Sequence, residues 1–118
     1  MQNYNELKVW DKAHQLTLKV YQLTKFFPKE EVYGLTSQVR RSAASIPANI
    51  AEGCGKNSQL ELAHYLNTSL GSANETEYHL LLAKDLSYFL VADHDILAQQ
   101  INKIKAMLIS LITKVREV

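Results

Sequence analysis

Carboxylate and imidazole side chains at helical spacing are the first candidates for chemistry in this sequence. Glu61 and His64 form a Glu-x-x-His pair, a spacing that supplies two ligands to the di-metal sites of helical bundles. Such sites need a second Glu-x-x-His pair and a glutamate from each of two other helices. Glu75 and His79 have a different spacing, so the sequence predicts no metal site. We expect Glu61 to cap a helix and His64 to lie on the surface or at an interface.

Cys54 is the single cysteine, which excludes an intramolecular disulfide and a multi-cysteine zinc site. No histidine lies near it in the sequence to activate it as a nucleophile, so an unreactive thiol is the interpretation. The segment 53–56 (GCGK) lacks the Gly-x-x-x-x-Gly-Lys-Ser/Thr spacing of a phosphate loop and follows a helical pattern, not a strand. We therefore expect no catalytic residue, no cofactor and no enzymatic activity.

Basic side chains are the remaining candidates, as contacts to phosphate. The net charge of the 118-residue chain is only +1, yet residues 1–56 hold eight basic and five acidic side chains, and residues 57–118 hold five and seven. Two interpretations are open: a solvated face with an Arg–Glu bridge between helices, or a basic face that binds nucleic acid. An oligomer would repeat that face and make it multivalent. The candidate contacts are Lys8, Lys12, Lys19, Arg40 and Arg41.

Apolar residues recur at alternating spacings of three and four along four segments, which is the pattern of packed helices. The chain shows no strand-like alternation, and it has only 4 glycines and 2 prolines. We expect a single all-α domain over residues 1–118, an antiparallel up-down-up-down four-helix bundle. The predicted helices cover residues 6–27, 34–53, 58–90 and 94–116.

Several residues mark where these helices begin, end or bend. Pro28 ends the first helix, and Pro47 predicts a kink in the second helix, or two short helices, near residues 45–47. Small residues around Gly71 predict a close approach by a neighbouring helix. The candidate caps are Asn3 with Glu6 or Asn5 for the first helix, Ser58 with Glu61 for the third, Asp93 or Asp95 for the fourth, and Gly53 at the stop after the second.

The last helix has more apolar residues than one seam uses. Its predicted seam includes Leu111 and Val115, while Met107, Ile109 and Ile112 lie outside it. Either the core face is broad, or these three residues form an interface in an oligomer. The N-terminal residues lack the pattern of a signal peptide, and no apolar run is long enough to span a bilayer. We expect a cytoplasmic protein with no membrane partner.

The second helical segment carries a longer pattern. Residues 33–53, YGLTSQVRRSAASIPANIAEG, closely resemble the signature of the 23S rRNA intervening-sequence proteins. Segments 7–10, 27–28 and 71–77 add flanking matches, so the resemblance covers nearly the whole chain. It implies an antiparallel four-helix bundle of bacterial origin that assembles as a homopentameric ring and has no established biochemical activity. The accessory protein of diversity-generating retroelements is similar, but it is basic, whereas this chain is near neutral.

The residues of this signature have types that suit structure as readily as chemistry. Pro47 would shape the helix, Ser45 and Asn49 would satisfy backbone groups around it, and Gly53 would permit the turn. Glu52 would pair with an arginine across helices or subunits. The leading hypothesis is an oligomeric scaffold that binds RNA, DNA or a ribonucleoprotein, and the alternative is a protein–protein interaction module without nucleic-acid binding. The signature residues are Arg40, Arg41, Ser45, Pro47, Asn49, Glu52 and Gly53.

Overall fold

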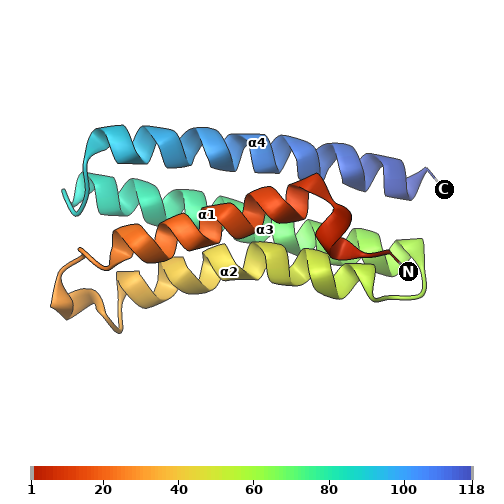
Figure 1. Cartoon of the computed structure of the whole chain (residues 1–118), viewed down its shortest axis with the longest axis horizontal. Coiled ribbons are helices and arrows are strands. Elements are labelled where there is room, and N and C mark those ends of the chain that lie inside the picture. Colours follow the sequence, from red (N-terminus) through yellow and green to blue (C-terminus); the bar gives the residue numbers. More distant parts are fainter. Residues whose placement is uncertain (1, 118) are drawn as a thin grey trace.

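The computed structural model describes residues 2–117 and consists of four long helices, which confirms the predicted all-α four-helix bundle. Figure 1 shows successive helices running in opposite directions, so α1 begins and α4 ends at the same end of the molecule. The molecule measures 46 × 24 × 20 Å along its principal axes. Its helices are α1 (Lys8–Thr24), α2 (Leu35–Cys54), α3 (Gln59–Asp85) and α4 (Val91–Arg116), with short 3₁₀ turns at Tyr4–Glu6 and Lys29–Glu31.

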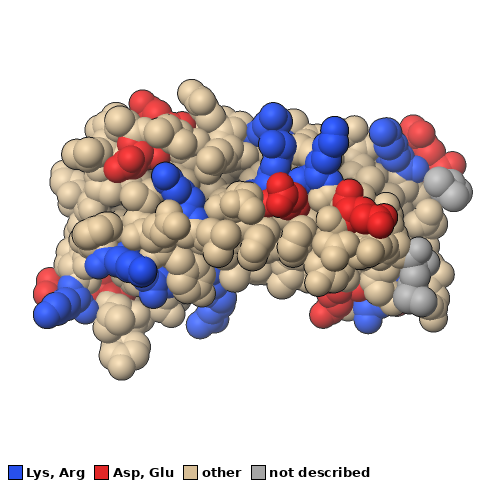
Figure 2. Space-filling model, in the orientation of Figure 1, with Lys and Arg blue, Asp and Glu red and all other residues tan. Residues whose placement is uncertain are grey.

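Charged side chains occur along the full length of the surface. In Figure 2, acidic and basic groups are spread from one end of the visible face to the other. Within residues 2–117, no helix is both long enough and apolar enough to cross a membrane.

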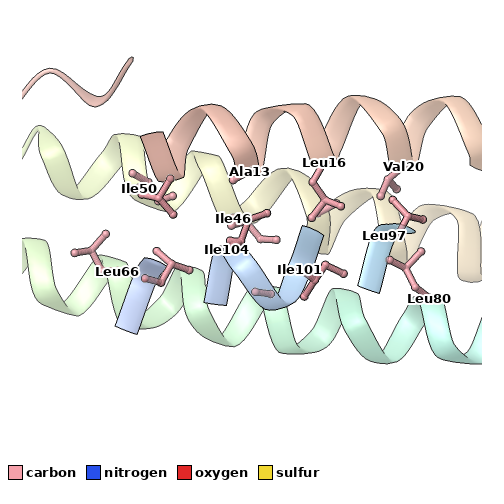
Figure 3. Packing of buried hydrophobic residues seen from close by; sticks show 14 of the residues in the cluster. Ala13, Leu16, Val20, Ile46, Ile50, Leu66, Leu80, Leu97, Ile101 and Ile104 are labelled. Atoms are coloured by element: carbon pink, nitrogen blue, oxygen red, sulfur yellow. The ribbon is translucent and has the colours of Figure 1, made fainter. Parts of the chain in front are cut away.

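The core forms where the apolar stripes of the four helices meet. Figure 3 shows these side chains from all four helices pointing toward one another along the bundle axis. On α1 the buried stripe follows the predicted spacing from Val9 to Val20, because residues three and four apart lie on one face of a helix. Fully buried members include Leu16, Ile46, Ile50, Leu66, Leu97, Ile101, Ile104 and Leu108.

The buried stripe of α4 differs from the prediction near its end. Ile112 is 6% exposed and belongs to the core, while Leu111 is only partly buried at its edge. A spacing of four residues therefore follows Leu108, where a spacing of three was expected. Either spacing keeps a residue near the core face of a helix, so the sequence pattern alone does not choose between them.

The third helix ends at Asp85, five residues before its predicted end. Ser87 has a positive φ of 63°, and the Ser87 and Tyr88 N–H groups donate to the Lys84 and Ala83 carbonyls, each at 2.9 Å. This backbone conformation ends the helix. The Tyr88 and Phe89 rings then pack against Phe27, with centroids 5.4 and 5.8 Å from its ring, so tertiary contacts hold this turn.

Of the predicted helix caps, only the third is confirmed. The Ser58 hydroxyl accepts from the Glu61 N–H at 3.1 Å, at the start of α3. Leu7 occupies the cap position of α1 and Leu90 that of α4, and neither helix has a side-chain cap. The predicted caps from Asn3, Asn5, Asp93 and Asp95 are therefore wrong, because both helices begin at other residues than expected.

Candidate functional site

Pro47 lies inside a continuous α2, and a residue of α1 compensates for it. The helix runs unbroken from Leu35 to Cys54, so two short helices are excluded, whereas the kink stays a prediction. A proline has no N–H, which leaves the carbonyl four residues earlier, that of Ala43, without its helical donor. The Thr17 hydroxyl of α1 forms a bifurcated hydrogen bond, to the Ala43 oxygen at 3.0 Å and to the Ala13 oxygen at 2.8 Å. The signature proline is thus accommodated by a side chain outside the signature.

The other face of the signature segment meets α3 through a row of hydroxyl groups. Ser45 and Ser72 join their hydroxyls at 2.9 Å, and the Ser69 hydroxyl donates to the Ile46 carbonyl at 2.8 Å. The Asn49 side-chain amide donates to the carbonyl and to the hydroxyl of Ser45, each at 2.8 Å, and so holds the Ser45 hydroxyl in this row. Short side chains allow the two helices to approach closely, and the hydrogen bonds satisfy buried polar groups. Ser42, Thr76 and His79 extend the row.

Gly53 has a packing role and not the predicted role as a stop. It lies within the last turn of α2, and its φ is not positive. A Cβ at this position would come within 2.8 Å of the Tyr65 Cβ and 3.1 Å of a Leu62 methyl carbon. Gly53 therefore sets the distance between α2 and α3. Gly71 differs, because a Cβ there would meet nothing within 4 Å. The close helix approach that the small residues around Gly71 predict is made by Ser69 and Ser72, which contact α2, and not by Gly71 itself.

The residues that were candidates for catalysis or metal binding form a helix cap, lie on the surface or are buried in the core. The Glu61 carboxylate accepts from the Ser58 hydroxyl at 3.2 Å, and His64 is exposed beside the Tyr65 ring. Cys54 is 2% exposed, and burial raises the pKa of its thiol, which disfavours the thiolate that a nucleophile needs. In the part of the chain that the structure describes, no three His, Cys, Asp or Glu side chains gather as a metal site.

Arg40 and Arg41 have different environments. The Arg40 Nε donates to the Thr24 hydroxyl at 2.8 Å and Nη2 donates to the Tyr21 carbonyl at 3.4 Å, while its guanidinium lies 4.8 Å from the centre of the Tyr21 ring. Arg40 thus ties α2 to the end of α1. Arg41 is exposed. The expected Arg–Glu bridge is not found within residues 2–117, where Glu52 is exposed and forms no ion pair.

Lysines from the two ends of the chain meet between α1 and α4. A groove of about 400 Å³ has an apolar floor that includes Leu7, Met107 and Leu111. Lys8, Lys103 and Lys114 line this groove, and Lys12 lines the adjoining hollow. We call the groove with these four lysines the α1–α4 lysine groove. Figure 2 shows basic side chains grouped over α4 and the start of α1, at the upper right of the view.

The sequence predicted two of the four lysines in this groove. Lys8 and Lys12 were predicted, whereas Lys103 and Lys114 were missed. Their positions in the sequence could have indicated them. Lys103 and Lys114 directly precede the buried residues Ile104 and Val115, just as Lys8 directly precedes the buried Val9, so all three lysines lie at the edge of a core stripe. Lys19 is half-buried on the same stripe of α1 as Lys8 and Lys12. Arg40 lines a separate hollow beside Lys25 and Lys29, so the five predicted contacts do not form one patch.

The three residues predicted to form an oligomer interface lie in three different environments. Ile112 is part of the core at 6% exposure and cannot contribute to a surface, which corrects its assignment. Ile109 is 54% exposed, so it remains available for contact with another molecule. Met107 is half-buried and lines the α1–α4 lysine groove.

One polar contact that the sequence does not indicate joins the two loops at the other end of the bundle. The Glu31 carboxylate accepts from the Leu35 N–H at 3.0 Å and from the Tyr88 hydroxyl at 2.7 Å. The hydrogen bond from the Leu35 backbone, followed by that from Tyr88, lowers the pKa of Glu31. The same carboxylate raises the pKa of the Tyr88 hydroxyl. Glu31 therefore caps α2 and anchors the α3–α4 turn.

Comparison with known proteins agrees with this architecture. A solved structure with 31% sequence identity and a TM-score of 0.82 covers 88% of this chain and 97% of its own; it is a protein of unknown function from the S23 ribosomal protein family of Bacteroides thetaiotaomicron VPI-5482. No curated protein matches the chain. The family model of the 23S rRNA-intervening sequence protein matches residues 5–110. This chain, with its signature helix packed between α1 and α3, belongs to the 23S rRNA-intervening sequence protein family.

Proposed function

We propose that this protein is a non-enzymatic helical scaffold whose α1–α4 lysine groove binds RNA. The observation that carries the proposal is the gathering of Lys8 and Lys12 from α1 with Lys103 and Lys114 from α4 around one groove. Lysine ammonium groups are mobile point charges that suit phosphate contacts without base specificity. Glu6 and Asp11 border one end of the groove and limit its positive potential.

Assembly would strengthen this weak electrostatic surface. The net charge of one chain is +1, so a single copy offers only a local basic patch. We propose a homo-oligomer, five copies by the family resemblance, in which each copy presents the same groove. Several linked patches bind one RNA far more tightly than each does alone. Exposed Ile109 supports contact with another chain.

An RNA titration at low salt tests the proposal. The double variant Lys8→Ala/Lys103→Ala should weaken binding of a structured RNA and lower the slope of log K against log salt, by about 1 for each lost phosphate contact. The matched control is Lys56→Ala/Lys84→Ala, which removes the same charge outside the groove. Absence of binding at low salt, or equal losses in both variants, would contradict the proposal. Arg41→Ala separately tests the exposed arginine of the signature.

A protein-interaction module is the second candidate, and the apolar floor of the same groove favours it. Leu7, Met107 and Leu111 offer a surface that phosphate contacts alone would not use. This alternative predicts a protein partner that is retained after nuclease treatment and lost in Met107→Asp. It also predicts that the parent protein does not bind RNA in the titration at low salt, so that titration separates the two functions.

A further inference from the structure

A second hollow lies at the other end of α1, where the chain turns into α2. It is an open hollow of about 370 Å³, within the size range of sites for small ligands. Pro28, the exposed Val32 and the edge of the buried Phe27 form an apolar wall. Lys25, Lys29 and Arg40 bring three positive charges to the same hollow. An apolar wall with a cationic rim fits an anionic group on a small apolar body.

The guanidinium of Arg40 is held in place before any ligand arrives. Its Nε is bound to the Thr24 hydroxyl, which itself donates to the Val20 carbonyl at 2.7 Å. Its Nη2 reaches the Tyr21 carbonyl at 3.4 Å, and the ring of Tyr21 supports the group from one side. These contacts leave the Nη1 donors without a partner inside residues 2–117. A fixed cation loses little conformational freedom when it binds an anion.

Thr36 adds an unused hydrogen-bonding group to the wall. The residue is only 6% exposed, and its hydroxyl forms no hydrogen bond within residues 2–117, unlike the buried hydroxyls of Thr17, Thr24 and Thr76. The Thr36 oxygen is not one of the buried, unpartnered atoms, so it is open to solvent and available to a ligand in the hollow. Thr36 lines the hollow from the first turn of α2, where the helix dipole favours negative charge.

No neighbouring acidic side chain forms an ion pair with the three cations of this hollow within residues 2–117. Glu30 and Glu31 precede α2 but are absent from its lining. The two oxygens of Glu31 are directed to the Leu35 N–H and the Tyr88 hydroxyl. The cationic rim is therefore free of a bound carboxylate.

We propose that this hollow binds a small phosphate monoester whose body is apolar. Three cations suit a dianionic phosphate better than a single carboxylate, and the guanidinium and ammonium groups both bind phosphate oxygens. The Thr36 hydroxyl would donate to the same group, and the organic part would lie against Pro28 and Val32. The site is independent of the α1–α4 lysine groove, so each proposal can fail without the other.

Titration of the ¹⁵N-labelled full chain with phenyl phosphate, followed by NMR, tests this site. We expect saturable shifts at the Thr36 amide and the Arg40 Nε–H, and an affinity at least tenfold higher than for inorganic phosphate. Lys29→Ala and Thr36→Val should each weaken binding about fivefold or more. Lys29 is exposed, so its variant tests the site without risk to folding. Lys103→Ala, in the other groove, should change the affinity less than twofold.

Several outcomes would overturn the assignment. Equal affinity for phenyl phosphate and inorganic phosphate would show that the apolar wall takes no part. Tighter binding of benzoate than of phenyl phosphate would contradict the choice of phosphate. Equal weakening by Lys29→Ala and Lys103→Ala would indicate general attraction to the surface, and displacement of phenyl phosphate by RNA would indicate a nucleic-acid surface instead of a small-molecule site.

Discussion

The hydroxyl of Thr17 on α1 donates to the carbonyl oxygen of Ala43 on α2 at 3.0 Å, the carbonyl that Pro47 leaves without a helical donor. The contact joins two residues that are 26 positions apart in the sequence. A buried carbonyl without a donor destabilises the folded state by about 1–3 kcal/mol. Thr17 therefore makes the signature proline compatible with an unbroken helix in the core.

This relationship predicts an energetic coupling between Thr17 and Pro47. Thr17→Val keeps the shape of the side chain but removes the hydroxyl, and should lower the free energy of unfolding by about 1–3 kcal/mol. Pro47→Ala restores an N–H for Ala43, so the same valine substitution should be less destabilising in that background. Urea unfolding of the two single variants and the double variant measures the coupling.

The control for this cycle is Thr113→Val. The Thr113 hydroxyl donates only within its own helix, to Ile109 at 3.0 Å, and is exposed. Its loss should have little effect. Additive effects of Thr17→Val and Pro47→Ala would contradict the role assigned to Thr17.

The two helical glycines should respond in opposite directions to alanine. Gly53→Ala places a Cβ 2.8 Å from that of Tyr65, and overpacking of this kind lowers stability by about 1–3 kcal/mol. Gly71→Ala meets no atom and gains helix propensity, so stability should rise by up to about 1 kcal/mol. Thermal unfolding of both variants at equal protein concentration is the measurement. A Gly71→Ala variant less stable than the parent would reveal another chain packed on that surface.

The contact between Glu31 and Tyr88 predicts a pH dependence of stability. Since the folded state lowers the pKa of Glu31 from 4.5, its contribution is present above that value and is lost as the pH falls through the folded pKa. The stability difference between the parent and Tyr88→Phe should therefore be largest near neutral pH and narrow as the pH falls below 4.5 and through the lowered pKa of Glu31. Tyr33→Phe is the control, because Tyr33 is 94% exposed. A difference that stays constant with pH would contradict this coupling.

Substitutions at Ile112 and Ile109 should affect folding and assembly, respectively. Ile112→Ala removes a core side chain and should cost about 2–5 kcal/mol of unfolding free energy. Ile109→Asp changes a 54% exposed position and should leave the fold intact. If Ile109 contacts another copy, this variant should lower the mass measured by light scattering. A parent protein that is monomeric at tens of micromolar would contradict the proposed oligomer.

Local pattern was sufficient for the helices and for most of the core, because burial of one stripe per helix requires the three-and-four spacing seen from Val9 to Val20. The capping of α3 by Ser58 was also predictable, since both partners lie within one turn. The end of α3 was not, because it depends on packing of Tyr88 and Phe89 against Phe27 from another loop.

The chain's residues by themselves determined an all-α bundle and its family, because spacing and the 33–53 signature are properties of neighbours in sequence. Only the tertiary structure decided which charges share a surface. Lys103 and Lys114 lie in one groove with Lys8, whereas Arg40 lines a separate hollow. The tertiary structure also assigned Gly53 to helix packing. These relationships depend on the rotation of each helix about its axis and on contacts between distant residues, and short-range spacing encodes neither.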